Sequence, residues 1–201
     1  MNFARLARSR LYLVLAADDV HVLEPALRGG VDIVQLRDKA LSDDGIVTAA
    51  KVFREACDEH DALFILNDRP DLVEACRADG VHVGRSDPRV EEARALVGGE
   101  RLVGVSVSTT AELDDVAGAD YAGVTAFATP TKQDAVAGGL ELVEAAAKSL
   151  HMPWFAIGGI TLGNAGEVVA AGAPGVAVVR AIRDADDPEA AAQELRAKLD
   201  R

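Results

Sequence analysis

Short apolar runs alternate along the chain with segments in which apolar residues recur at helical spacing. Leu11–Leu15 is entirely apolar and a second run appears at Val31–Gln35, and both predict strands that are buried on both faces. Between them, a short helix is expected to end near Arg28–Gly30. Across Ile46–Cys57, apolar residues return every three or four positions, which predicts a helix ending near His60.

The same alternation continues to the end of the chain. It predicts eight strands, each followed by a helix, with the last helix beginning at Pro188 after Asp187 as its N-cap. The remaining strands are expected at residues 63–66, 81–83, 102–105, 121–124, 154–157 and 176–179, and the remaining helices at residues 71–78, 88–97, 111–116, 140–150 and 164–171.

Four similar segments mark the points at which a helix turns into a strand. Glycine is expected to supply the left-handed cap in Gly30–Ile33, Ala78–Val81, Gly118–Tyr121 and Gly172–Val176, which precede the even-numbered strands. The repeating unit is therefore a pair of βα units that occurs four times. This repeat predicts an α/β fold, a single (β/α)₈ TIM barrel over residues 1–201. A doubly wound open sheet is the alternative, but its glycine-rich turn is missing after the first strand.

Composition and charge narrow the class of protein. Hydrophobic residues make up 49% of the chain and aromatic residues only 4%, so Ala, Val, Leu and Ile must build the core. The net charge of −12 argues against a nucleic-acid or membrane partner, and no apolar run is long enough to span a bilayer. The N-terminus lacks a signal-peptide core, so we expect a cytoplasmic protein. Cys57 and Cys76 are expected to be reduced.

Positive charge gathers at the predicted carboxyl ends of the strands, where active sites form in barrels of this kind. Any one of these side chains, taken alone, could be an ordinary surface residue. Six cations at one rim of an acidic protein instead indicate an anionic ligand with more than one phosphate. We expect these six to converge: Arg37, Lys39, Arg69, Arg85, Lys132 and Arg180.

The loop after the sixth strand carries groups that suit a phosphate ester. Thr129 and Thr131 supply hydroxyls, Pro130 stiffens the backbone between them, and Lys132 supplies an ammonium group. The segment from Phe127 to Gly139 is also longer than a βα connection needs. An ordinary turn is the alternative for this loop taken alone.

Two carboxylates, Asp68 and Asp87, follow neighbouring strands within the basic rim. Mg²⁺ is typically held by one or two carboxylates together with phosphate oxygens of the substrate, so these residues are candidate metal ligands. They could instead be salt-bridge partners of the rim cations. Asp38 is a poorer candidate, because Arg37 and Lys39 flank it.

The last two strands predict a second phosphate site. Gly158-Gly159 precedes a helix after the seventh strand, and Val179-Arg180 follows the eighth. In barrels, backbone N–H groups of these two loops commonly bind a phosphate. A tight turn that only allows close packing is the alternative.

Taken together, these motifs resemble those of thiamine phosphate synthases over nearly the whole chain. The matching segments are Gln35–Lys39, Asn67–Arg69, Gly104–Ser106, Thr129–Lys132, Ile157–Ile160 and Gly175–Ile182. The resemblance implies a Mg²⁺-dependent transferase that couples hydroxymethylpyrimidine diphosphate to hydroxyethylthiazole phosphate and releases diphosphate.

The resemblance also implies a role for each matching position. Lys132, Arg37, Lys39 and Ser106 would act in catalysis, and Asp68 and Asp87 would hold the metal. The pyrimidine diphosphate would be bound by Gln35, Leu36, Arg37, Asp38, Lys39, Asn67, Ser106 and Lys132. The thiazole phosphate would be bound by Thr129, Pro130, Thr131, Gly159, Val179 and Arg180.

The implied reaction is largely dissociative, and needs no protein nucleophile. No Ser-His-Asp or Cys-His set is evident at the strand ends, and His82 is expected to be a buried, hydrogen-bonded core residue. One alternative is the sister family of thiazole tautomerases. The resemblance implies that their chemistry relies on a histidine in the loop after the sixth strand, and this chain has no histidine there. A second alternative is a non-catalytic barrel that binds phosphate ligands.

A homodimer is compatible with the sequence.

Overall fold

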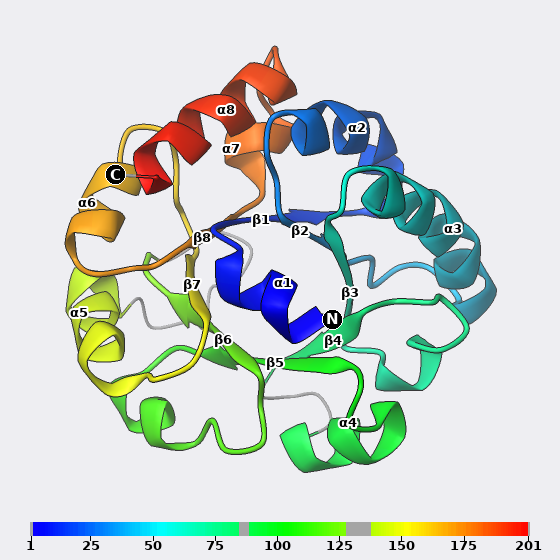
Figure 1. Cartoon of the computed structure of the whole chain (residues 1–201), viewed down its shortest axis with the longest axis horizontal. Helices are drawn as coiled ribbons and strands as arrows, with labels where there is room; N and C mark the ends of the chain where they lie inside the picture. Colours follow the sequence, from blue (N-terminus) through cyan, green and yellow to red (C-terminus); the bar gives the residue numbers. More distant parts are fainter. Residues whose placement is uncertain (1, 85–88, 128–137, 201) are drawn as a thin grey trace.

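The computed structural model describes residues 2–84, 89–127 and 138–200 of the chain. Eight parallel strands form a closed barrel in sequence order, as Figure 1 shows, and the predicted TIM-barrel architecture is confirmed. The strands are β1 (Leu11–Leu15), β2 (Ile33–Leu36), β3 (Leu63–Asn67), β4 (Gly80–Val83), β5 (Leu102–Val107), β6 (Tyr121–Thr125), β7 (Trp154–Ile157) and β8 (Val176–Val178).

Helices surround the barrel and cover its outer face (Figure 1). Asp187 caps the last of them as predicted, because its carboxylate accepts a hydrogen bond from Ala190 N at 3.0 Å. The predicted outer helices appear as α2 (Val20–Arg28), α3 (Asp43–Glu59), α4 (Val90–Val97), α5 (Gly139–Ser149), α6 (Ala165–Ala170) and α8 (Pro188–Leu199).

Two predicted α-helices are wrong. The segment 71–78 forms a 3₁₀ helix, η2 (Pro70–Leu72), followed by turns, and the segment 111–116 forms η3 (Thr110–Asp114). In the first segment, Arg77 turns the backbone into the left-handed region at φ 53°, so too few residues remain for an α-helix. In the second, Gly118 does the same at φ 82°.

The sequence did not reveal α1 (Asn2–Arg8) or the single turn α7 (Arg180–Arg183). Figure 1 shows α1 lying across the middle of the ring of strands. Its Leu6 is 2% exposed and packs with residues of the barrel interior. Because α1 leads directly into β1, it closes the amino end of the barrel and leaves the carboxyl end open.

Apolar residues fill the inside of the barrel near its amino end. Tyr12, Tyr121 and Phe155 are buried there, and Phe155 meets both tyrosine rings edge-on. Leu63, Leu102 and other inward residues pack around them, while a separate outer core joins the strands to the helices. This packing gives a rigid frame for the groups at the carboxyl end.

Each of the first three repeats carries an aspartate that joins two strands and an outer helix. Asp79 Oδ2 accepts hydrogen bonds from Phe64 N at 2.8 Å and Arg54 Nη1 at 2.9 Å. Asp32 bonds Leu11 N and Arg196 in the same way, and Asp120 bonds Val103 N and Arg94. The repeat in the sequence therefore reflects a repeated contact at the amino end. Glycine supplies the left-handed residue in three of the four repeats, whereas Arg77 supplies it before Asp79.

The described residues also bear on the expectations about membrane spans and disulfides. None of their helices is long and apolar enough to cross a membrane. Cys57 and Cys76 are buried and form no disulfide, as predicted.

Candidate active site

A cavity of about 560 Å³ opens at the carboxyl end of the barrel. Its wall includes residues from all eight strands, because parallel strands bring their carboxyl ends to one edge. Residues that are far apart in the sequence thus become neighbours. Among the predicted site residues, the following line the cavity: Gln35, Arg37, Asn67, Ser106, Gly159, Val179 and Arg180.

Side chains alternate at the end of β2. Gln35 and Arg37 line the cavity, whereas Leu36 between them is 2% exposed and packs in the outer core. Leu36, a predicted binding residue, therefore does not line the cavity. The Asp38 carboxylate accepts a hydrogen bond from Ala40 N at 3.0 Å and belongs to the loop rather than to the cavity wall.

The loops after β2 and β3 are joined by an ion pair between Lys39 and Asp68. Lys39 Nζ lies 3.1 Å from Asp68 Oδ2, with the carboxylate side chain 17% exposed. Asp68 has a left-handed backbone, with φ at 61°, and its N–H donates to the carbonyl of His82 on the neighbouring strand. This hydrogen bond fixes the start of the loop next to the cavity-lining Asn67.

The structure corrects the predicted convergence of cations at Arg69. Its guanidinium group bonds Asp43 and Asp71, each at 2.7 Å. Hydrogen bonds from Arg69 lower the pKa of both carboxyl groups. Arg69 is therefore neutralised at the outer side of its loop, and it does not line the cavity.

By contrast, Arg37 and Arg180 both line the cavity. Within the described part of the chain, neither of them forms an ion pair. Two guanidinium groups in one cavity suit an anionic ligand with more than one charged group.

His82 occupies a place that the sequence did not predict. It is half-buried on β4 and lines the cavity, and its Nε2 lies 3.0 Å from Ser106 Oγ on β5. The expectation of a hydrogen-bonded histidine holds, but the residue borders the cavity rather than the closed core. Ser106 and His82 thus form a hydroxyl–imidazole pair at the floor of the site. The spacing of residues in the sequence gave no signal for this contact.

The turn after β7 has a backbone that favours glycine at two successive positions. Gly158 and Gly159 have φ of 98° and 61°, where other residues are strained. A Cβ on Gly158 would also lie 2.5 Å from the carbonyl oxygen of Phe127. Asn164 Nδ2 donates to the Gly159 carbonyl at 2.9 Å and holds the turn in place. The backbone of this turn therefore forms part of the cavity wall.

The loop after β8 adds two residues that the sequence analysis missed. Arg183 and Asp184 line the cavity beyond Arg180, and Arg183 Nε donates to Asp184 Oδ1 at 2.6 Å. This hydrogen bond lowers the pKa of the Asp184 carboxyl group. Their position follows from the short helix α7, which the sequence pattern did not reveal.

Several predicted site residues lie outside the described residues: Arg85, Asp87, Thr129, Pro130, Thr131 and Lys132. Their predicted roles therefore stay predictions.

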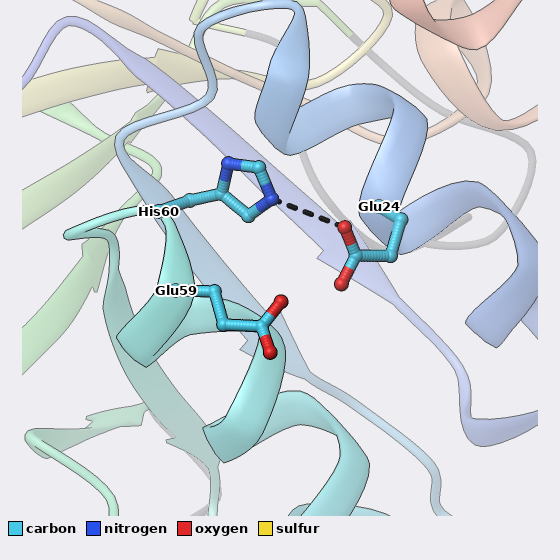
Figure 2. Close-up of side chains that lie close together, drawn as sticks. All are labelled: Glu24, Glu59 and His60. Atoms are coloured by element: carbon cyan, nitrogen blue, oxygen red, sulfur yellow. Dashed lines mark hydrogen bonds and ion pairs between the residues drawn. The ribbon is translucent and has the colours of Figure 1, made fainter.

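A second group of possible metal ligands lies on the outer face of the barrel, between α2 and α3. Figure 2 shows Glu24, Glu59 and His60, whose ligand atoms lie within 4.8 Å of one another. The His60 Nε2 atom is 3.0 Å from Glu24 Oε2. Both glutamates are exposed, and exposed acidic groups are common without an ion. None of the three lines the cavity, so we treat the cluster as a contact between two helices.

Comparison with known proteins agrees with this geometry. The sequence model of the thiamine monophosphate synthase family matches residues 10–182. The chain belongs to this family. The family expected from the sequence motifs is therefore confirmed.

Relatives in the family are similar over almost the whole of this chain. A thiamine-phosphate synthase of Thermobifida fusca is 46% identical over 97% of this chain and 94% of its own length. One from Thermosynechococcus vestitus is also 46% identical, but this chain covers only 57% of that longer protein. Both relatives bear the name of an enzyme, and the expectation of an enzyme family is confirmed.

A solved structure supports the same assignment. The thiamine phosphate pyrophosphorylase of Pyrococcus furiosus superposes with a TM-score of 0.89 at 33% identity, covering 100% of this chain and 98% of its own. A 3-hexulose-6-phosphate synthase superposes with a TM-score of 0.68 at 24% identity, which shows a shared fold alone.

Proposed function

We propose that this protein is a thiamine-phosphate synthase that couples 4-amino-5-hydroxymethyl-2-methylpyrimidine diphosphate with hydroxyethylthiazole phosphate. The observation that carries the proposal is one cavity lined by residues of both predicted binding regions. Gln35, Asn67 and Ser106 come from strands β2, β3 and β5, and the loops after β2, β7 and β8 supply Arg37, Gly159 and Arg180. Two substrates bound to these regions would meet inside the cavity.

The diphosphate belongs near the loops after β2 and β3. Arg37 makes no ion pair in the described residues, and Lys39 lies close by in the same loop. Both cations can stabilise the negative charge that develops on the departing diphosphate oxygens. The exposed position of Lys39, at 59% of its side chain, leaves its ammonium group accessible to a ligand.

Asp68 fits a role as ligand to Mg²⁺, together with Asp87, which lies outside the described residues. The Asp68 carboxylate offers the hard oxygen donor that Mg²⁺ prefers, and it pairs with Lys39, whose side chain is exposed. Bound Mg²⁺ would neutralise charge on the diphosphate leaving group.

The pyrimidine ring belongs deeper in the cavity. Asn67 and Ser106 offer polar groups on inward positions of β3 and β5, next to the buried amide of Gln35. The Ser106 hydroxyl is held by His82, so it presents a fixed direction to a ligand. These groups can orient a flat ring that carries nitrogen atoms.

The thiazole phosphate belongs at the opposite wall. Gly158 and Gly159 line the cavity, and Arg180 lines it from the start of α7 on the neighbouring strand's loop. Backbone N–H groups and a guanidinium group together suit a phosphate monoester. Thr129 and Thr131 are expected to complete this side.

The reaction requires no covalent intermediate with the protein. The bond between the pyrimidine methylene carbon and the diphosphate oxygen breaks, and its electron pair leaves with the diphosphate. The electron-rich aminopyrimidine stabilises the methylene cation, and the lone pair of the thiazole nitrogen then forms the new carbon–nitrogen bond. The cavity contributes by aligning the two rings and by excluding water from the cation.

The proposal is tested by incubating the pure protein with both substrates and Mg²⁺. Thiamine phosphate and diphosphate should appear in equal amounts, and chelation of Mg²⁺ should stop their formation. Omitting the thiazole phosphate is the control for simple hydrolysis. Saturable binding of both substrates without any diphosphate release would instead identify a non-catalytic barrel.

A further inference from the structure

The amide of Gln35 lies where the closed interior of the barrel opens into the cavity. Its side chain is almost fully buried and borders both the large cavity and a small interior one of about 30 Å³. Its Nε2 donates to the Tyr12 hydroxyl at 2.7 Å. Tyr12 lines the small cavity only, so it contacts Gln35 from the inner side.

Tyr12 is held firmly in this position. Its hydroxyl oxygen is 3.1 Å from that of Tyr121, and its ring meets Phe155 edge-on with the centroids 5.4 Å apart. Gly104 faces the Tyr121 ring, where a Cβ would collide with it. Burial raises the pKa of both tyrosines well above the ordinary value, so both hydroxyls stay protonated.

An amide has one donor side and one acceptor side. Since Nε2 of Gln35 donates to Tyr12, the acceptor Oε1 is on the side of the amide that faces the cavity. None of the described residues donates a hydrogen bond to Oε1. A ring that covers this carbonyl without bringing an N–H group would leave it buried and unpaired, which is costly, so the site favours a ligand that carries such a group.

We propose that the Tyr12 hydroxyl fixes the Gln35 amide with its carbonyl toward the cavity, and thereby selects a heteroaromatic substrate that carries an N–H donor. Tyr12 is then a positioning residue, because it acts only through Gln35. The inference rests on the proposed function, in which the donor is the exocyclic amino group of the aminopyrimidine diphosphate. A ring without this group would leave Oε1 unpaired.

The test compares two ligands by calorimetric titration in the presence of Mg²⁺. One is the 4-amino pyrimidine diphosphate and the other is its analogue with hydrogen in place of the amino group. The wild-type protein should prefer the amino ligand by roughly tenfold to a hundredfold or more in Kd. Tyr12→Phe keeps the ring and frees the amide to rotate, so the preference should fall by roughly tenfold.

Tyr121→Phe is the matched control, because it deletes a hydroxyl from the same interior without touching Gln35. Its preference should stay within about threefold of wild type. In a Gln35→Met background, Tyr12→Phe should change the preference no further, since the amide through which it acts is gone. If Tyr12→Phe does not fold, Gln35→Met alone must abolish the preference.

The outcomes separate this inference from the proposed function. If folded Tyr12→Phe keeps the wild-type preference, or if wild type shows none, the inference is overturned. If Tyr12→Phe lowers the preference but the wild type never releases diphosphate in the coupling assay, the proposed function fails while the positioning role of Tyr12 stands.

Discussion

The two ends of the barrel use their charged side chains differently. At the amino end, Asp32, Asp79 and Asp120 each accept a backbone N–H from a neighbouring strand and pair with an arginine from an outer helix. At the carboxyl end, Arg37 and Arg180 face a cavity and make no ion pair within the described residues. The amino-end pairs thus stabilise the fold, whereas Arg37 and Arg180 leave two guanidinium groups available to an anionic ligand.

The barrel interior shows the same division. Near the amino end, water is excluded by the buried side chains of Leu63, Leu102 and Leu6, the last from helix α1. Toward the carboxyl end, inward positions are held by Asn67 and Ser106, which would be costly in a closed core. Polar residues on inward strand positions therefore mark the side where the barrel is open. Substitutions should accordingly affect stability at one end and activity at the other.

The largest effect is expected at the carboxyl end, for Asp68→Ala. Loss of a proposed Mg²⁺ ligand should lower kcat/KM for coupling by roughly 10²–10³-fold or more. Asp71→Ala is the matched control, because Asp71 follows the same strand but pairs with Arg69 away from the cavity. Steady-state diphosphate release should be normal in the control. Equal losses in both variants would contradict the assignment of Asp68.

At the amino end, Asp79→Ala should reduce stability rather than activity. The change leaves Arg54, which is 6% exposed, without its buried partner and removes the acceptor for Phe64 N. Breaking such a pair costs about 3–5 kcal/mol, which urea unfolding would measure. Asp58→Ala removes the exposed partner of the same arginine and should cost about 1 kcal/mol or less. A loss of kcat per folded molecule in Asp79→Ala would contradict the division between the two ends.

A smaller effect is expected for Gly158→Ala at the turn after β7. The positive φ and the contact with the Phe127 carbonyl should together cost about 1–3 kcal/mol and displace the turn. We expect KM for the thiazole phosphate to rise by roughly tenfold, with KM for the pyrimidine diphosphate little changed. Gly166→Ala in α6 has open space for its Cβ and should leave both values intact. A selective change in the pyrimidine KM would place the two substrates the other way round.

The smallest effect concerns the two buried thiols. Burial raises the pKa of Cys57 to about 12 and that of Cys76 to about 11, above the ordinary value of 9.0. Their contribution to stability is therefore complete below about pH 9 and is lost as pH rises toward the folded-state values. At pH 8, a thiol reagent should label the folded protein slowly and the urea-unfolded protein fast. Fast labelling of the folded protein would show that the thiols are accessible.

The sequence pattern predicted the barrel because its signals are local and repeated. Apolar runs such as Leu11–Leu15 and the capping Asp187 depend on a few neighbouring residues, and the structure has both. Residues 71–78 failed because a composition that suits a helix was overridden by a left-handed residue close to the next strand. Helix α1 was missed because its single buried residue, Leu6, gives no periodicity.

The residues of the candidate active site were predicted only in part. The rule that chemistry collects at the carboxyl ends of strands pointed to Arg37, Ser106 and Arg180. It could not separate Arg69 from these, because the partners Asp43 and Asp71 are chosen by the fold of the loop. Contacts between strands, such as those of His82 and of Tyr12 with Gln35, depend on register and cannot be read from spacing alone.

The most direct test of the account is a crystal structure of the protein with thiamine phosphate, diphosphate and Mg²⁺. We predict that both products lie in the carboxyl-end cavity, with the pyrimidine against Gln35, the thiazole phosphate between Gly159 and Arg180, and diphosphate beside Arg37. Products bound at any other surface, with this cavity holding only solvent, would contradict the claim that the open end of the barrel performs the chemistry.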